Sequence, residues 1–336
     1  MNIKEIGKEY GYNLKELANA ADIPYTTLAS IKDKEISNWK QEYVSKLSDV
    51  LDTDIVKLSK SEVLTPFIKW VGGKRQIVRF LKEYAPSHYS TYYEPFIGGG
   101  ALLLSLQPER AVINDWNEEL VNVWKVVKDF PNDLIKLLEV HKKNNSKDYY
   151  LNLRSADRDG RIAEMTPVER AARFIFMNKT GFNGLWRVNS KGQNNVPYGR
   201  YSNPKIISPS LEKVSSYLNE NDVKITSGDY RAAVSEAVSN DFVYFDPPYI
   251  PVSPTSSFTS YTSNGFGLLQ QEQLRDTAIE LHNRGVKVML SNADVPLIEE
   301  LYSDSIFTIN RVQASRAINS KGSGRGKVDE VIITTY

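Results

Sequence analysis

Short runs of apolar and aromatic residues recur along most of this 336-residue chain, and segments with helical spacing separate them. Runs of this length that end at turn residues are typical of buried strands. One predicted strand begins at Tyr92, and the others cover 111–115, 223–229, 241–245, 285–292 and 329–335. Because strands and helices alternate, the sequence predicts an α/β fold with a mostly parallel, doubly wound sheet.

Residues 1–60 show only helical spacing and predict a small all-α domain, followed by a linker over 60–66. Helical segments cover 14–21, 25–32 and 40–51, and the first of them begins after an Asn. A helix, a tight turn and a second helix with an outward polar face resemble the Cro/repressor type of helix-turn-helix. This domain contains nine Lys, no Arg and ten acidic residues, so a helical interaction or dimerisation domain is an open alternative.

The predicted strand 241–245 leads directly into Asp246-Pro247-Pro248-Tyr249. Proline cannot donate to a strand ladder, so the strand ends here and leaves a carboxylate and an aromatic ring at its carboxyl end. In an open α/β sheet, ligands bind at that end of the strands. An ordinary proline turn is the alternative to a functional site.

This motif suits a reaction at the exocyclic amine of a nucleobase. The lone pair of such an amine is delocalised into the ring, so its hydrogens need acceptors while the nitrogen attacks an electrophilic methyl group. The Asp246 carboxylate and a carbonyl held in place by prolines provide these acceptors. The Tyr249 ring offers a face on which an extruded base can stack.

Two glycine turns mark candidate cofactor contacts. Gly72-Gly73 lies between Trp70 and Lys74, and such a pair permits close approach of the backbone to a ligand. The second turn, 98–100, follows the strand that begins at Tyr92 and precedes a helix, so a ligand can lie at the helix N-terminus. Its pattern is not G-x-G-x-x-G, which disfavours nicotinamide cofactors.

Two further predicted strands end in acids, Asp115 and Asp229. By the logic of dinucleotide-binding folds, an acid at the position of Asp115 suits ribose hydroxyls. A structural alternative is that Asp115 is the N-cap of the helix predicted over 117–127. Asp229 is expected near the adenine of the cofactor.

Residues 128–215 separate these motifs from the catalytic turn and predict an insertion that begins with helices, one of them over 168–176. Asn183-Gly184 and Lys191-Gly192 are typical of hairpin turns. Seven basic residues and no acidic one lie between Arg170 and Ser210, with aromatic residues and glycines interleaved. Basic, amide and aromatic side chains on turns suit groove reading and base displacement.

The net charge of +1 does not by itself indicate nucleic acid, but a second basic segment, 311–327, supports phosphate contacts. The absence of cysteine excludes disulfides, thiolate zinc sites and cysteine nucleophiles. Three separated histidines argue against a histidine-rich metal centre. No apolar run is long enough to span a membrane and no signal-peptide pattern is present, so a cytoplasmic protein is expected.

Between Phe67 and Tyr336, the cofactor motifs come first, then the insertion, and then Asp-Pro-Pro-Tyr. In this order, the motifs resemble those of the Dam family of DNA adenine methyltransferases. The resemblance implies a Rossmann-like S-adenosylmethionine-dependent methyltransferase fold over 61–336, with a target-recognition insertion over 128–215. It implies methylation of adenine N6 in GATC, with double-stranded DNA as the partner. No metal is expected, since the reaction is a direct displacement at a sulfonium methyl and no ligand cluster is visible in the sequence; a monomer is expected. The implied catalytic residues are Asp246, Pro247, Pro248 and Tyr249. The implied cofactor-binding residues are Trp70, Lys74, Glu94, Phe96, Gly98, Asp115, Asp229 and Asp246.

The resemblance also implies DNA contacts by Lys69, Phe182, Asn183, Arg187, Pro197 and Tyr201. Phe182 and Asn183 match the position where family members insert an aromatic side chain and an amide into the duplex, and Phe stands here where Tyr is common. Arg187, Pro197 and Tyr201 match base-reading positions, whereas Lys69 matches a lysine near the first guanine. The N-terminal helix-turn-helix domain departs from the plain family pattern.

Three other classes remain open at this point. A cytosine N4 DNA methyltransferase would share the catalytic turn. A DNA-binding regulator with an inactive methyltransferase fold would have altered motifs, whereas the motifs here are intact. A protein glutamine methyltransferase would share the fold but usually has Asn at the position of Asp246, which disfavours that class.

Overall fold

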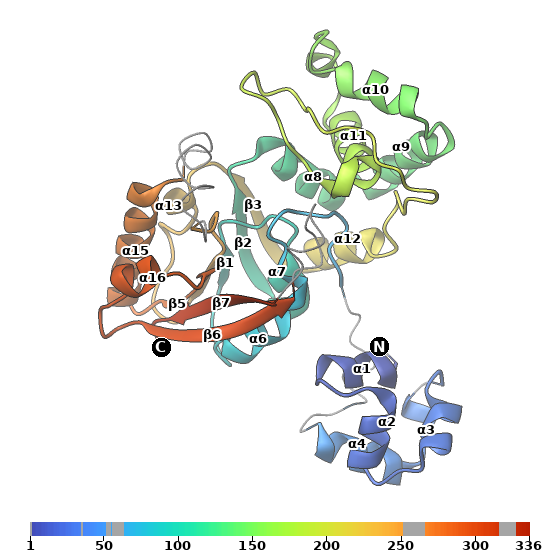
Figure 1. The fold of residues 1–336 in the computed structure, drawn as a ribbon, viewed down its shortest axis with the longest axis vertical. Coiled ribbons are helices and arrows are strands. Elements are labelled where there is room, and N and C mark those ends of the chain that lie inside the picture. Colours follow the sequence, from blue (N-terminus) through green and yellow to red (C-terminus); the bar gives the residue numbers. More distant parts are fainter. Residues whose placement is uncertain (1, 35, 52–54, 56–63, 251–265, 316–326) are drawn as a thin grey trace. The chain divides into compact units, whose positions relative to one another are not determined.

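The computed structural model describes residues 2–34, 36–51, 55, 64–250, 266–315 and 327–336. Its contacts divide the chain into two compact units, Met1–Leu64 and Thr65–Tyr336. The two units are described separately, and Figure 1 shows the elements of each.

The first unit contains α1 (Ile3–Glu9), α2 (Leu14–Ala20), α3 (Tyr25–Ile31), the short helix η1 (Ile36–Asn38) and α4 (Gln41–Val50). Apart from α1 and η1, these are the helices that the sequence predicts. Helices α1 and α2 begin with capping boxes, in which Asn2 pairs with Glu5 and Asn13 pairs with Glu16. The apolar faces form a separate core that includes Ile6, Leu17, Leu28 and Leu47.

The second unit is built on a seven-stranded sheet in the order β3-β2-β1-β4-β5-β7-β6. The strands are β1 (Tyr92–Glu94), β2 (Arg110–Asp115), β3 (Asp222–Ser227), β4 (Phe242–Phe245), β5 (Lys287–Ala293), β6 (Thr308–Ser315) and β7 (Lys327–Thr334). The first five strands in this order pair in parallel, whereas β7 is antiparallel to both of its neighbours. The sheet is therefore mostly parallel, as predicted, and β6 is an additional edge strand.

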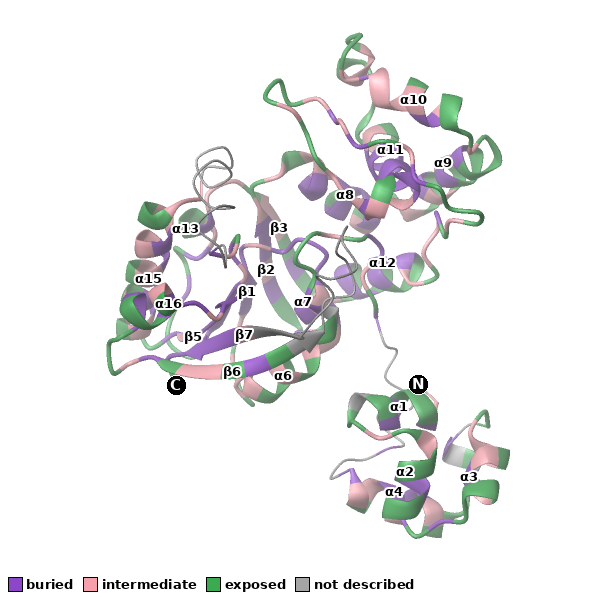
Figure 2. Cartoon of the chain, in the orientation of Figure 1, coloured by how far each residue is buried: buried purple, intermediate pink, exposed green. Residues whose placement is uncertain are grey.

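Helices cover both faces of the sheet (Figure 1). One face packs against α13 (Tyr230–Ala233), α15 (Leu268–Asn283) and α16 (Pro296–Leu301), which share a core with the sheet. The other face carries α6 (Val78–Tyr84), α7 (Ala101–Leu106), α8 (Glu118–Asp129) and α12 (Leu211–Glu220). Figure 2 shows buried residues along β1, β5 and β7 between these layers. The central strands are buried on both faces, which explains their nearly continuous apolar sequence.

A lobe follows α8 and contains α9 (Pro131–Lys143), α10 (Lys147–Ser155), the short helices η3 (Arg161–Ala163) and η4 (Phe182–Gly184), and α11 (Pro167–Thr180). Helix α11 includes the predicted 168–176 segment. Lys191-Gly192 forms a hairpin turn as predicted, since Val188 bridges Asn194 and the Asn189 N–H donates to the Gln193 carbonyl. Asn183 and Gly184 both have positive φ, and the Leu185 N–H donates to the Phe182 carbonyl at 3.2 Å. Positive φ at both central residues is the type I′ geometry of hairpin turns, so the turn is as predicted, although among the described residues the segments on its two sides do not pair with each other as strands.

Candidate active site

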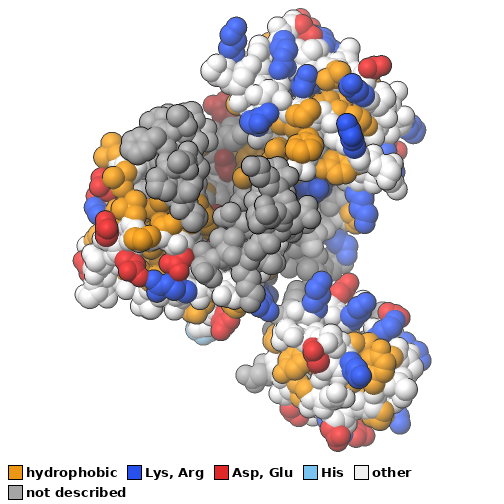
Figure 3. All heavy atoms as spheres, in the orientation of Figure 1, with side chains coloured by type: hydrophobic (Ala, Val, Ile, Leu, Met, Phe, Trp, Pro, Cys, Tyr) orange, Lys and Arg blue, Asp and Glu red, His pale blue; other side chains and the backbone are white. Residues whose placement is uncertain are grey.

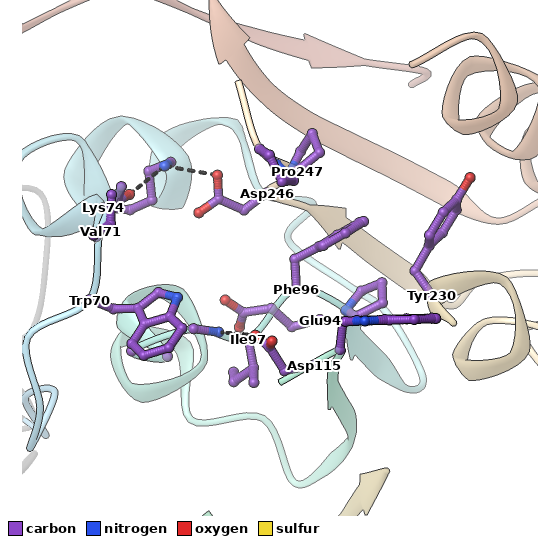
Figure 4. A pocket seen from close by; sticks show the side chains of 18 of the residues that line it. Trp70, Val71, Lys74, Glu94, Phe96, Ile97, Asp115, Tyr230, Asp246 and Pro247 are labelled. Carbon is purple, nitrogen blue, oxygen red and sulfur yellow. Dashed lines mark hydrogen bonds and ion pairs between the residues drawn. The ribbon is translucent and has the colours of Figure 1, made fainter. Parts of the chain in front are cut away.

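The Asp246 carboxylate lies at the carboxyl end of β4, whose four residues are all buried. Its Oδ1 atom accepts from Lys74 Nζ at 2.8 Å and from Ser291 Oγ at 3.0 Å. Burial raises the pKa of Asp246, and the Lys74 ammonium and the Ser291 hydroxyl oppose that rise. Figure 4 shows the Lys74–Asp246 pair at the edge of a pocket. The carboxylate is therefore held in one orientation in a largely desolvated place.

The residues after Asp246 are held by side chains from neighbouring elements. Gln271 Nε2 donates to the Pro248 carbonyl at 2.9 Å, and the Tyr249 hydroxyl donates to Glu330 Oε2 at 3.0 Å. Lys74 Nζ also lies 4.4 Å from the centroid of the Tyr249 ring. Among the hydrogen bonds of the described residues, none ends at the Pro247 carbonyl. The turn thus offers one carboxylate and one carbonyl to a ligand.

Three residues that support this turn, Ser291, Asn292 and Gln271, are missed by the sequence reasoning. Ser291 and Asn292 lie near the carboxyl end of β5, which pairs in parallel with β4. Asn292 Oδ1 accepts from the Ile250 N–H at 3.1 Å, and its Nδ2 donates to Gln271 at 3.3 Å. The position of Ser291 and Asn292 at a strand end next to the motif is a signal that could have identified them, whereas nothing local marks Gln271.

The turn from Asp246 to Tyr249 borders a cavity of about 1090 Å³. Lys69 lines this cavity, and so do all eight residues predicted to bind the cofactor. These eight are Trp70, Lys74, Glu94, Phe96, Gly98, Asp115, Asp229 and Asp246. They come from the carboxyl ends of four parallel strands and from the segment before α6. Figure 4 shows Trp70, Glu94, Asp115 and Asp246 around the same pocket.

Glycine backbone forms the floor of this cavity. Gly98 has φ of +48°, and a Cβ on it would lie 2.6 Å from Trp70 Cδ1. Gly100 has φ of +67°, and a Cβ there would lie 2.6 Å from Trp124 Cη2. A side chain at either position would meet an indole ring, so the turn keeps Trp70 close to the backbone.

Asp115 accepts from the Gly98 N–H at 3.0 Å and from the Asn117 N–H at 2.9 Å. It is not the N-cap of α8, because Asn117 holds that position and accepts from the Leu120 N–H. The N-cap alternative for Asp115 is therefore wrong. Asp229 does cap α13, and the guanidinium of Arg231 lowers its pKa.

Burial also raises the pKa of two other acids that line the cavity, Glu94 and Asp115. The pKa of Glu94 rises from 4.5 to about 8, although its Oε2 accepts from Tyr92 and from the Leu103 N–H. The pKa of Asp115 is raised for the same reason. Desolvated carboxylates of this kind favour a cationic ligand, because a nearby positive charge stabilises their ionised form.

These features fit S-adenosylmethionine, the cofactor that the sequence resemblance implies. Its sulfonium and ammonium groups would complement the acids Glu94 and Asp246, and its carboxylate would complement Lys74. Asp115 provides acceptors for a ribose diol. The stacked rings of Phe96 and Tyr230, 5.3 Å apart, provide an apolar wall for an adenine. The volume is also sufficient for a ligand of this size.

A second cluster contains the residues predicted to contact DNA. Lys69 Nζ lies 5.3 Å from the centroid of the Tyr201 ring, and the Lys69 side chain packs against Gly184 of the turn that holds Phe182 and Asn183. The Phe182 N–H donates to the Pro197 carbonyl at 2.9 Å. Phe182 is 46% exposed, so this ring is available to a partner.

Arg187 lies on the hairpin next to this cluster, and its Nε–H donates to Asn195 Oδ1 at 2.6 Å. On the face shown in Figure 3, the lobe that contains α9, α10 and α11 presents Lys and Arg side chains around apolar ones. In the second basic segment, Arg316, Lys321 and Arg325 lie outside the described residues.

No helix within the described part of the chain is long and apolar enough to cross a membrane. The same residues contain no group of three or more His, Cys, Asp or Glu side chains that could hold a metal ion.

Comparisons with known proteins agree with this geometry. The family model for D12 class N6 adenine-specific DNA methyltransferases matches residues 70–318. The type II methyltransferase M1.LlaDCHI of Lactococcus lactis subsp. cremoris is 55% identical over 281 residues, which cover 83% of this chain and 98% of that protein. The type II methyltransferase M.MjaIII of Methanocaldococcus jannaschii is 41% identical over 290 residues, or 81% and 99% of the two chains. The DNA adenine methylase of Vibrio cholerae serotype O1 is 35% identical over 269 residues, or 79% and 94%.

The Glu94 carboxyl predicts a pH dependence of stability in the cofactor-free protein. Between pH 4.5 and about 8 it is protonated when folded and ionised when unfolded, so the stability it contributes falls as the pH rises through this window. The slope contributed by one such group is at most about 1.4 kcal/mol per pH unit. Glu94→Gln should remove this slope, as measured by urea unfolding at pH 5, 6, 7 and 8.

Asp229→Asn is a matched control for this prediction. Because the pKa of Asp229 is lowered, its contribution is lost only at more acidic pH, and the slope between pH 5 and 8 should stay as in the wild type. An unchanged slope in Glu94→Gln would show that Glu94 is ionised in the folded protein.

Proposed function

The chain belongs to the D12 class of N6 adenine-specific DNA methyltransferases, and from this premise we propose that it methylates the adenine of GATC in duplex DNA. It is an adenine-specific enzyme that uses S-adenosylmethionine, so cytosine N4 methylation and an inactive methyltransferase fold are set aside. The GATC target rests on the sequence resemblance. The contiguous cluster of Lys69, Phe182, Pro197 and Tyr201 beside the cavity is the observation that supports it.

We propose that the Asp246 carboxylate and the Pro247 carbonyl accept hydrogen bonds from the two N–H groups of the target amine. S-adenosylmethionine, when bound, supplies an electrophilic methyl group. Prolines fix the carbonyl, and Ser291 and Lys74 fix the carboxylate, so little reorganisation is needed when charge develops on the amine nitrogen. Tyr249, held through its hydroxyl by Glu330, offers its ring to the extruded base.

The lobe over 128–215 is proposed to be the target-recognition domain. Phe182 and Asn183 project from a tight turn, which can enter a duplex at the site of the extruded adenine. Arg187, oriented by Asn195, would read a guanine from the major groove. Lys69 and Tyr201 would contact the first base pair of the site.

The N-terminal unit is proposed to be a helix-turn-helix that contacts DNA outside the methylated site. Helices α2 and α3 are separated by four residues, and Thr26 and Ser30 are exposed on α3. The alignment with M1.LlaDCHI covers 98% of that relative but 83% of this chain, so a segment about the size of this unit is additional. The relatives named type II methyltransferases support a role in modification beside a restriction enzyme.

The target is tested with labelled S-adenosylmethionine and duplexes that carry GATC or a single changed base. Label should appear as N6-methyladenine, and only with GATC. Asp246→Ala should lower single-turnover methylation by ~10²–10³, because a preorganised acceptor is lost. Ser291→Ala removes one partner of the carboxylate and should cost less. Turnover near the wild-type rate by Asp246→Ala would sink the catalytic assignment.

Removal of residues 1–64 should leave GATC-selective methylation in place, because the cavity and the catalytic turn lie in the second unit. Affinity for long duplexes should fall about tenfold, equivalent to about 1.4 kcal/mol. Gel-shift titrations and methylation rates of the two proteins check this. If the folded truncation lost all methylation, the first unit would be integral to the site.

Arg187→Ala should relax specificity more than it lowers the affinity for cofactor. Loss of a bidentate arginine–guanine contact costs about 1–3 kcal/mol of discrimination at one base pair. The measurement compares turnover on GATC with turnover on duplexes changed at one base. Lys191→Ala, at the tip of the same hairpin, is the control and should affect all duplexes alike. A uniform loss in Arg187→Ala would make Arg187 a backbone contact.

A further inference from the structure

We propose that Asn178 is a positioning residue that couples duplex binding to cofactor binding. The proposal rests on the proposed function, in which the turn Phe182–Gly184 contacts DNA and Trp70 contacts the cofactor. Asn178 lies on α11 and contacts neither ligand surface, because it is fully buried.

The side-chain amide of Asn178 joins two segments that are far apart in sequence. Its Oδ1 accepts from the Lys69 N–H at 3.0 Å, and its Nδ2 donates to the Lys69 carbonyl at 2.8 Å. The same Nδ2 donates to the Gly184 carbonyl at 2.8 Å. One amide therefore holds both backbone groups of Lys69 and the last residue of the DNA-contacting turn.

Lys69 is followed directly by Trp70, which packs over Gly98 in the cavity. A second connection runs through aromatic rings. Trp70 stacks with Phe174 at 6.1 Å between centroids, and Phe174 stacks with Trp186 at 3.9 Å. Trp186 is the neighbour of Arg187 on the recognition lobe. The hydrogen bonds of Asn178 and the stacked ring of Phe174 both start from α11. Each of them connects the segment of Trp70 with the proposed DNA-contacting surface.

Relative movement of Lys69 and Gly184 would leave a buried carbonyl or amide without a partner, at a cost of about 1–3 kcal/mol. The two segments therefore move as one body. A duplex that orders the Phe182–Gly184 turn also orders Lys69 and Trp70, so the cofactor then binds with a smaller loss of conformational entropy. The coupling is reciprocal, because both ligands act on the same equilibrium.

The coupling is measured as the ratio of two dissociation constants for S-adenosylhomocysteine, without and with a duplex of the sequence that the wild-type enzyme methylates. We expect a wild-type ratio of at least about fivefold, the lower end of typical couplings. Asn178→Ala should bring the ratio to within about twofold of one. If Asn178 had a purely structural role, its loss would weaken the binding of each ligand and leave the ratio of the two dissociation constants unchanged.

Thr180→Val is the matched control. Thr180 is buried on the same helix, but among the described residues its hydroxyl bonds only the Phe176 carbonyl of α11. Loss of this hydroxyl should therefore leave the wild-type ratio unchanged. Trp186→Ala breaks the aromatic link at a partly exposed side chain and should lower the ratio as well. If Asn178→Ala does not fold, the Trp186→Ala variant provides the test instead.

The proposal is overturned by a wild-type ratio near one, by folded Asn178→Ala or Trp186→Ala variants that keep the wild-type ratio, or by Thr180→Val losing it. Phe182→Ala separates this from a failure of the proposed function. It should weaken duplex binding while Asn178 is intact. Unchanged duplex binding by Phe182→Ala would instead show that DNA does not contact this turn, and the premise itself would fall.

Discussion

The ion pair between Lys74 and Asp246 fixes the geometry on which the active site depends. The two side chains come from different segments that line the cavity and are 7% and 19% exposed, so their attraction is screened less than that of a surface pair. Lys74 also donates to the Gly72 carbonyl and lies over the Tyr249 ring. Removal of either charge would leave the other buried without a counter-charge. The pair therefore ties the segment before α6 to the end of β4 at the edge of the cavity.

The same cavity contains more acid than base, and the protein accommodates this through protonation. Glu94, with a pKa of about 8, is mostly neutral at pH 7, whereas Asp246 is balanced by Lys74. The site is thus closer to neutral without a bound cation, and a positive ligand would favour ionisation of Glu94.

The sequence predicts the parts of this arrangement that depend on local pattern. Asp246 and Asp115 are identified because each follows a short apolar strand, and parallel strands bring their carboxyl ends to one edge. The edge strand β6 is missed because it contains few apolar residues, and α1 is missed because it has only seven residues, of which two, Ile3 and Ile6, are buried apolar residues of the core. Gln271 and Asn178 are missed because their roles depend on tertiary hydrogen bonds, which leave no periodic pattern.

Irregular backbone at the two functional turns explains why such side-chain amides are present. Both turns lie outside the strands and α-helices that pair most backbone groups, and buried carbonyls and N–H groups need partners. Gln271 and Asn292 meet this need at the turn that begins with Asp246, and Asn178 meets it at the Phe182–Gly184 turn. Because these amides hold the backbone, exposed side chains such as Phe182 and Arg187 can differ without a change in turn geometry. Under the proposed function, base preference could therefore vary on the lobe while the acceptors for the target amine stay fixed.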